Sequence, residues 1–179
     1  MQIAESIKAL FRRHSLKKHA STQPTGFMPI SKVRSAVAFI DVEDTSFHEC
    51  KQKLQNFFRE NNIRGDIFFF DFRKLPDGER LITSITGTVL KKDLNWYGRP
   101  SDDKIRILLE GEPDMFISLL PKADFPIEFM ATCSNARFKA GRFQIPGNVF
   151  DLVITDPADR NLNQAEAFDE MEKLLTRIR

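Results

Sequence analysis

The apolar run Ile67–Phe70 constrains the fold more than any other part of the chain. A strand with one face in water alternates apolar and polar residues, and this run of Ile-Phe-Phe-Phe has no polar break. Gly65 and Asp66 precede it and Asp71 follows it, so it has the length of a strand. We therefore predict a strand covered on both faces, as in a parallel sheet with helices above and below.

The composition agrees with a single packed domain. A chain of 179 residues with 41% hydrophobic residues is long enough to bury a core. Phenylalanine occurs 17 times, against one Trp and one Tyr. Because the Phe ring has no polar atom, we expect most of these rings inside the protein rather than on a large recognition surface.

Other apolar runs alternate with amphipathic segments along the chain. We predict strands at residues 35–42, 65–72, 81–90, 114–120, 138–142 and 150–156, and helices at residues 46–61, 101–110, 125–134 and from 163 onward. This alternation is typical of a Rossmann-like three-layer α/β domain with a mostly parallel sheet. We assign residues 35–179 to that single domain.

Two of the predicted helices have a clear apolar face. The helix after the first strand starts with Ser46 and Glu49 at the spacing of a capping box. Its apolar face holds Phe47, Cys50, Leu54, Phe57 and Phe58. The last helix is predicted to turn inward Phe168, Met171, Leu174, Leu175 and Ile178. Cys50 and Cys133 both fall on apolar helix faces, so we expect buried free thiols and a reducing compartment.

Residues 1–34 form a basic segment ahead of this domain. They hold seven Lys or Arg and one acid, whereas the rest of the chain holds 20 basic and 24 acidic residues. The apolar residues of the segment recur at helical spacing among the basic ones: Ile3, Ile7, Leu10 and Phe11. We predict a basic amphipathic helix, then a linker at residues 20–31.

Two interpretations of this helix stay open. It either contacts an anionic membrane surface weakly, or it packs on the domain. The mildly acidic body argues against nucleic acid as a partner. We expect a cytoplasmic protein, peripheral at the inner membrane if the helix binds lipid.

The common signatures of catalysis and of cofactor binding are missing from the sequence. Residues 41–45, after the first strand, contain no Gly and therefore no phosphate-binding loop. The spacing of His14, His19 and His48 does not suit zinc. We expect neither a metal nor a cofactor, and a Cys–His pair formed only in the fold stays open.

Polar residues at the predicted carboxyl ends of strands form the first candidate site. They are Asp41, Glu43, Asp44, Asp71, Arg73 and Asp156. Carboxylates gathered at one edge of a sheet can hold a cation or act as acid and base. The alternative is structural: Asp44 caps a helix, Asp156 starts an Asp-Pro turn and Asp71 is solvated.

Two further segments are candidates for ligand contact. Trp96, Tyr97 and Arg99 can offer a stacking surface and a guanidinium to a ligand, or the Trp plugs one end of the sheet. The basic residues of the second segment form either an anion site or an exposed edge of the sheet protected by charge: Arg137, Lys139 and Arg142, of which Arg137 and Lys139 share one face of the strand. We favour the charged edge.

Four segments follow one another in a characteristic order: Asn95-Trp-Tyr-Gly, Pro113-Asp-Met-Phe-Ile, Ser134-Asn-Ala-Arg-Phe-Lys-Ala-Gly-Arg and Phe150-Asp-Leu-Val-Ile. Together they resemble an uncharacterised family of short bacterial proteins, best known from Bacteroidetes. The likeness spans about residues 5–178. It implies no catalytic residue.

A second resemblance is at the level of the fold. A strand ending in Asp, a helix, a short strand with Gly-Arg and a further buried strand are similar to the amino-terminal half of heptosyltransferase-type glycosyltransferases. The sugar-nucleotide half of those enzymes has no counterpart in the chain.

We predict a non-catalytic binding or interaction module with an unknown protein or small-molecule partner. Its contact surface would be the strand-end rim with the Trp96–Arg99 loop. The alternative is an enzyme, such as a transferase acting on a phosphorylated or sugar substrate. It would use Asp41, Asp71 and Asp156 together with Arg99 or Arg142.

Overall fold

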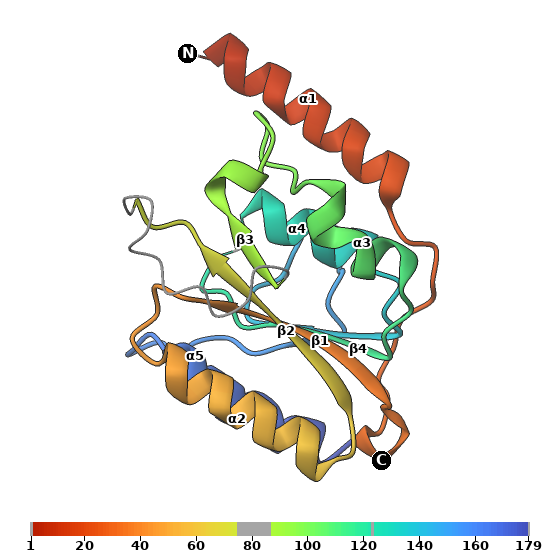
Figure 1. Ribbon diagram of the computed structural model, residues 1–179, viewed down its shortest axis with the longest axis vertical. Helices are drawn as coiled ribbons and strands as arrows, with labels where there is room; N and C mark the ends of the chain where they lie inside the picture. The colour runs from red at the N-terminus through yellow and green to blue at the C-terminus, as the bar shows by residue number, and fades with distance from the viewer. Residues whose placement is uncertain (1, 75–86, 123, 179) are drawn as a thin grey trace.

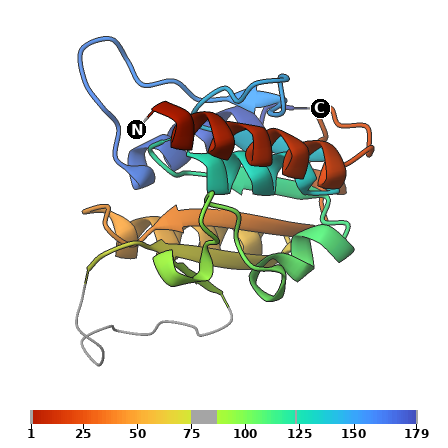
Figure 2. The same cartoon turned by 90° about the horizontal axis from the view of Figure 1, so that it is seen from above.

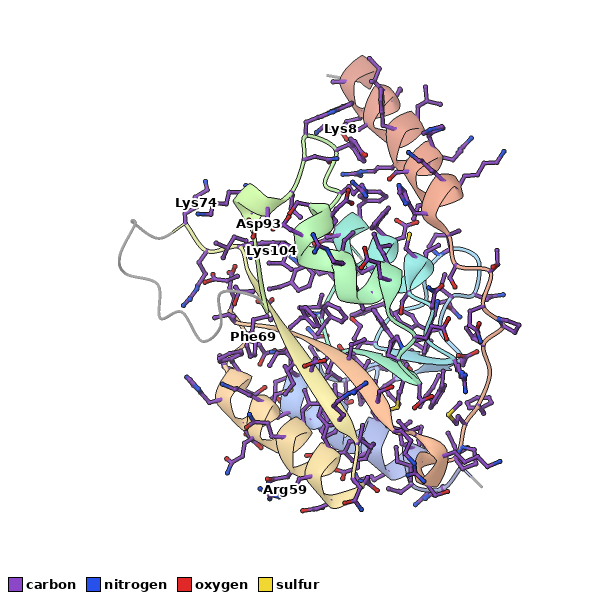
Figure 3. The ribbon with its side chains drawn as sticks, turned by 45° about the vertical axis from the view of Figure 1, so that its right-hand side comes forward. Lys8, Arg59, Phe69, Lys74, Asp93 and Lys104 are labelled. Atoms are coloured by element: carbon purple, nitrogen blue, oxygen red, sulfur yellow. The ribbon has the colours of Figure 1, made fainter. Side chains whose placement is uncertain are left out.

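The computed structural model describes residues 2–74, 87–122 and 124–178 (Figure 1). Along the chain these form α1 (Gln2–His19), η1 (Ile30–Lys32), β1 (Ser35–Asp41), α2 (Phe47–Glu60), β2 (Arg64–Asp71), β3 (Thr88–Leu90), η2 (Lys91–Asp93), α3 (Asp102–Glu110), β4 (Met115–Ser118), α4 (Phe125–Cys133), β5 (Phe138–Gly141), β6 (Leu152–Val153) and α5 (Gln164–Leu175). The elements η1 and η2 are short 3-10 turns. Figure 3 shows Asp93, at the end of η2, next to Lys104 of α3, with which it forms an ion pair of 3.9 Å.

The strands form one parallel sheet in the order β3-β2-β1-β4-β5-β6. Helices α2 and α5 cover one face, and α3 and α4 cover the other (Figure 1). The predicted Rossmann-like α/β arrangement is thus confirmed. Between β1 and β4 the strand order reverses, and in such sheets ligands bind outside the carboxyl ends of the strands at this point.

The Phe-rich strand β2 is covered on both faces, as its sequence predicts. Phe69 belongs to the core under α2 and α5 and packs on Phe47 of α2, with ring centroids 5.5 Å apart. Phe68 and Phe70 belong to the core under α3 and α4. The unbroken apolar run therefore supplies rings to both cores.

Phenylalanine rings of the central strands pack against one another on the face of the sheet that α3 and α4 cover. Phe39 of β1 stacks on Phe68 of β2 at a centroid distance of 5.2 Å. On its other side Phe39 lies 5.0 Å from Phe116 of β4. The three strands that meet at the switch in strand order thus share one aromatic layer.

The start of α2 differs from the predicted capping box. Ser46 makes no side-chain cap for α2. Its hydroxyl donates to Asp44 Oδ1 at 2.7 Å and accepts from the backbone N–H of Ala165 at 3.0 Å. The capping box at Ser46 and Glu49 is therefore wrong, because the start of α2 lies against the start of α5 and the hydroxyl serves that helix. The apolar face predicted for α2 is confirmed as buried.

The last helix buries Phe168, Met171 and Leu175 as predicted, but Leu174 is 39% exposed. The buried positions recur every three or four residues along α5, and this stripe turns Leu174 outward. The inward assignment of Leu174 is therefore wrong. Ile178, beyond the helix, is partly buried against the core.

The outer strands of the sheet are short. β6 has two half-buried residues, so the prediction of a buried strand over residues 150–156 is wrong in extent, although the flanking Phe150 and Ile154 are buried. β3 has three residues. The predicted beginning of that strand, at residues 81–86, lies outside the described residues.

The N-terminal helix α1 lies alongside α4 on the outer side of the domain (Figure 2). Arg12 Nε donates to the backbone carbonyl of Tyr97 at 2.7 Å, and Ser15 is buried. The linker that follows is held by backbone hydrogen bonds from Ser21 N–H to the Thr132 carbonyl and from Gly26 N–H to the Arg137 carbonyl, both 3.0 Å. One side of α1 thus packs on the domain, and a domain boundary at residue 34 stays a prediction.

Two further observations concern the whole described chain. Cys50 and Cys133 are buried free thiols, as predicted. In the three described ranges, no helix combines the length and the apolar character needed to cross a bilayer.

Candidate functional site

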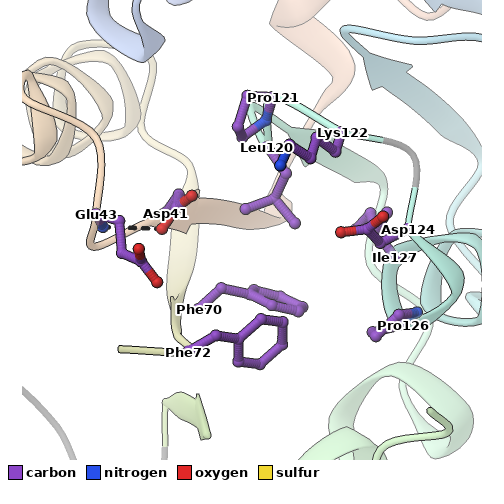
Figure 4. A pocket seen from close by; sticks show the side chains of 10 residues that line it. All are labelled: Asp41, Glu43, Phe70, Phe72, Leu120, Pro121, Lys122, Asp124, Pro126 and Ile127. Atoms are coloured by element: carbon purple, nitrogen blue, oxygen red, sulfur yellow. Dashed lines mark hydrogen bonds between the residues drawn. The ribbon is translucent and has the colours of Figure 1, made fainter. Parts of the chain in front are cut away.

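A cavity of about 320 Å³ lies at the carboxyl ends of β1, β2 and β4 (Figure 4). This is the switch in strand order, and the volume is at the lower end of the range of about 300–1,000 Å³ for small-molecule sites. Its charged lining residues are Asp41, Glu43, Lys122 and Asp124. The other described lining residues are apolar or proline.

Asp41 ends β1 and forms part of the acidic wall. Its carboxylate Oδ1 accepts from the backbone N–H of Glu43 at 2.8 Å. Its own backbone is fixed by Gln164 of α5, whose side-chain oxygen accepts from the Asp41 N–H at 2.6 Å and whose amide donates to the Asp41 carbonyl at 2.8 Å. The start of α5 therefore sets the position of this carboxylate.

The electrostatic surroundings of Asp41 favour a positive partner. Burial is the main cause that raises the pKa of Asp41, and the charges of Glu43, Asp44 and Asp71 raise it further, against the hydrogen bond from Glu43. Glu43, Asp44 and Asp71 therefore lie close enough to act on Asp41 through their charges. A cation bound beside Asp41 would relieve this repulsion.

Asp71 ends β2 and is only 4% exposed. Arg73 binds it through two parallel hydrogen bonds, Nε to Oδ1 at 2.9 Å and Nη2 to Oδ2 at 3.0 Å. The alternative that Asp71 is solvated is therefore wrong. In the described part of the chain Asp71 does not line the cavity, and it acts on the site through its charge.

The apolar part of the cavity lining consists of aromatic and aliphatic side chains. Phe70 and Phe72 meet edge to face at 5.3 Å, and both line the cavity (Figure 4). Leu120 and Ile127 face them across the opening (Figure 4). Sequence reasoning assigned these Phe residues to the core only. The signal that it missed is their spacing of two around Asp71, which puts both rings on one face of a strand end.

The Trp96–Arg99 loop is located elsewhere. Trp96 packs edge-on against Phe11 of α1 at 5.0 Å. The Arg99 guanidinium lies over the ring of Phe129 of α4 at 5.1 Å and pairs with Asp102. Among the described lining residues of the cavity, Trp96, Tyr97 and Arg99 do not occur. The structure therefore brings this loop to α1 and α4 and not to the acidic rim.

Lys139 shows that the charged-edge interpretation of β5 is wrong. β5 lies between β4 and β6, and Lys139 is 4% exposed. Its Nζ donates to the carbonyl of Ala131 in the last turn of α4 at 2.7 Å, and burial lowers the pKa of the amine to about 8. The last carbonyl groups of a helix have no hydrogen-bond donor within that helix. Lys139 is buried because its amine donates a hydrogen bond to one of these carbonyl groups.

Arg142 follows β5 and is also buried. Its Nη2 donates to Asp156 Oδ1 at 2.9 Å and to the Leu162 carbonyl at 2.7 Å. Its Nε and Nη1 are buried without a hydrogen-bond partner in the described part of the chain. The side chain lines a small space of about 10 Å³ that shares Leu120, Lys122 and Ile127 with the large cavity. Arg142 and Asp156 thus pair with each other and not with Asp41.

Comparison with known proteins places the chain in a family. The sequence pattern of a Family of unknown function (DUF6913) matches residues 6–178, which is nearly the whole chain. The chain belongs to this family. No curated protein and no solved structure matches it.

Membership of DUF6913 confirms the resemblance to an uncharacterised family. The comparisons give no support to the bacterial origin or to the likeness to heptosyltransferase-type enzymes. The site of this DUF6913 chain must therefore be interpreted from its own residues.

The described carboxylates of this DUF6913 chain do not gather as metal ligands. Within residues 2–74, 87–122 and 124–178, no group of three or more His, Cys, Asp or Glu residues could hold a metal ion. Acidic groups beside aromatic walls in a cavity of this size suit an organic ligand better than a bare cation.

Proposed function

We propose that this DUF6913 protein is a non-catalytic binding module for a small organic molecule that carries a positively charged amine. The observation that carries the proposal is the cavity at the switch between β1 and β4, which combines apolar walls with carboxylates. We further propose a cytoplasmic location, in line with two buried free thiols.

The charges of the cavity favour a cation. Asp41 and Glu43 lie on one side and Asp124 on the other, whereas Lys122 is the only basic residue among its described lining residues (Figure 4). A cation placed between these walls lowers the repulsion that raises the pKa of Asp41. An anionic ligand would increase this repulsion.

The walls favour an apolar body attached to that cation. The rings of Phe70 and Phe72 offer both a face for a cation and area for an apolar group. Ligand sites of this kind are largely apolar, with a few polar groups that fix the orientation. Asp41, whose backbone is fixed by Gln164, is suited to that orienting role.

Two probes of similar shape and opposite charge test the proposal. We expect 2-phenylethylamine to raise the melting temperature of the full chain and 3-phenylpropionate to leave it unchanged. A ligand that binds only the native state stabilises it by about 2.7 kcal/mol at a hundredfold excess over Kd. Thermal shift gives the first reading and calorimetric titration gives the Kd.

A matched pair of variants locates the binding. Asp41→Asn should abolish the response to the amine. Asp66→Asn removes an exposed carboxylate near the opposite end of β2 and should retain the response. No response to the amine, or an equal response in both variants, would contradict the proposal.

A transferase acting on a phosphorylated or sugar substrate is the second candidate. The observation that favours it is Asp41, because a carboxyl group with a raised pKa at a strand end suits acid–base chemistry. Arg142, with its two unpartnered nitrogens, lines the adjoining space. A melting-temperature increase with sugar phosphates, and none with amines, would contradict the amine ligand and favour a phosphorylated or sugar substrate.

A further inference from the structure

We propose that the outer face of α1, together with Trp96, binds an anionic membrane surface. This surface and the strand-end cavity are formed by different residues, so a test of one proposal does not decide the other.

The surface exposes four large apolar side chains. Leu10 is 65% exposed, Trp96 57%, Phe11 46% and Ile7 44%. The helix has no Trp of its own, and the loop after η2 places Trp96 edge-on against Phe11 at 5.0 Å. Trp prefers the headgroup region of a bilayer, where its ring is apolar and its N–H reaches water. The fold thus completes an amphipathic helix with an aromatic residue from a distant part of the sequence.

The loop that carries Trp96 is attached to the helix. Arg12 Nε donates to the Tyr97 carbonyl at 2.7 Å, and its guanidinium lies over the Phe125 ring of α4 at 4.9 Å. Phe11 also contacts the Tyr97 ring at 5.9 Å. These contacts turn Arg12 inward and hold Trp96 beside the outward-facing residues of α1. The exposed apolar patch formed by Ile7, Leu10, Phe11 and Trp96 is therefore present before any partner binds.

The charge next to the patch matches anionic lipid. Arg13, Lys17 and Lys18 are exposed on the second half of α1. Residues 1–34 hold seven basic residues and one acid, whereas the remainder holds 20 basic and 24 acidic residues. A negative surface thus attracts the α1 side and repels the body, which orients the protein.

The position of the patch favours a flat partner. α1 is the outermost helix on its side of the sheet (Figures 1 and 2). A planar bilayer can reach Leu10, Phe11 and Trp96 together on such a helix, with the basic residues at the headgroup level. Amphipathic helices with Lys and Arg beside Trp, Phe and Leu bind membranes in this way.

Sedimentation of the full chain with vesicles tests the proposal. We expect binding to phosphatidylcholine vesicles that contain phosphatidylserine, weak binding to phosphatidylcholine alone, and loss of binding at high salt. Because Trp96 is the only Trp of the chain, its emission reports on the patch directly. We expect a blue shift on addition of the phosphatidylserine vesicles.

Surface variants separate the patch from other exposed groups. Leu10→Ser should weaken binding about tenfold, because one partly inserted side chain is lost. Phe27→Ser is the control, since Phe27 is 64% exposed but packs on Phe138. The double variant Lys17→Glu/Lys18→Glu should also weaken binding. Lys173→Glu, an exposed lysine of α5, should not.

Three results would overturn the proposal. One is no sedimentation with phosphatidylserine vesicles at low salt. Another is sedimentation with unchanged Trp96 emission, since the patch would then not touch lipid. The third is a concentration-dependent dimer that Leu10→Ser dissociates, because the patch would then be covered by a second copy of the chain.

Discussion

Lys139 is a buried basic side chain that donates a hydrogen bond to the carboxyl-terminal end of a helix. Its amine donates to the Ala131 carbonyl of α4, and burial lowers its pKa from the ordinary 10.5 to about 8. Between these two pH values Lys139 binds more protons in the unfolded chain than in the native protein. Its contribution to the free energy of unfolding therefore rises as the pH rises from about 8 to about 10.5, and the full cost of the buried charge is present below pH 8. Burial raises the pKa of the Cys50 and Cys133 thiols to about 12, and above about pH 9 these two groups contribute in the opposite direction.

Lys139→Met should remove the contribution of Lys139, because Met keeps the bulk of the side chain without a titrating group. The difference between the wild type and this variant should change by about 3 kcal/mol across the window. Urea unfolding at a series of pH values measures it. Lys173→Met, at an exposed position, should keep the wild-type slope. An unchanged slope in Lys139→Met would show that the amine is not buried in solution.

Gly65 in β2 allows the close approach of α2. A Cβ atom at this position would lie 2.0 Å from the ring of Phe58, which is buried. Gly65→Ala should therefore lower the free energy of unfolding by about 1–3 kcal/mol, the usual cost of overpacking. Gly26→Ala is the control, because no atom lies within 4 Å of its Cβ position. Equal stability of the two variants in urea unfolding would contradict the packing described for β2.

At the scale of elements, the start of α5 depends on a capping box. Asn163 Oδ1 accepts from the Glu166 N–H at 2.9 Å, and Glu166 accepts from the Asn163 N–H at 3.0 Å. Because α5 also positions Gln164 under Asp41, this cap supports the candidate site.

Asn163→Ala should destabilise the protein by about 1 kcal/mol, the typical loss of an N-cap. Asn161→Ala, at an exposed position two residues earlier, should have little effect. Thermal unfolding of both variants measures the difference. A larger loss for Asn161→Ala would contradict the assignment of the cap.

The central elements could be predicted from the sequence because their signals are local. The apolar runs of β1, β2 and β4 and the helical spacing in α2 need no knowledge of distant residues. The role of Ser46 could not be predicted, because its hydroxyl accepts from Ala165, a partner in another helix. The buried position of Lys139 could not be predicted for the same reason. A charged side chain indicates an exposed position, and its acceptor, the Ala131 carbonyl, belongs to another element.

At the scale of the whole molecule, the sequence predicted one wall of the candidate site. Asp41 was found because it follows an apolar run. The opposite wall was missed, since only the sheet order brings β4 next to β1; it is formed by residues 120–122, 124, 126 and 127. Contact between Phe11 and Trp96 likewise depends on how α1 lies across the loop after η2.

The sheet keeps its longest strands inside and its shortest outside. β1 and β2 have seven and eight residues, whereas the outer strands β3 and β6 have three and two. An exposed strand edge is a template on which other chains can pair and aggregate, and short edges limit that pairing. In the described part of the chain, each outer strand therefore offers only two or three residues for intermolecular strand addition, although β3 covers only Phe69–Asp71 of β2.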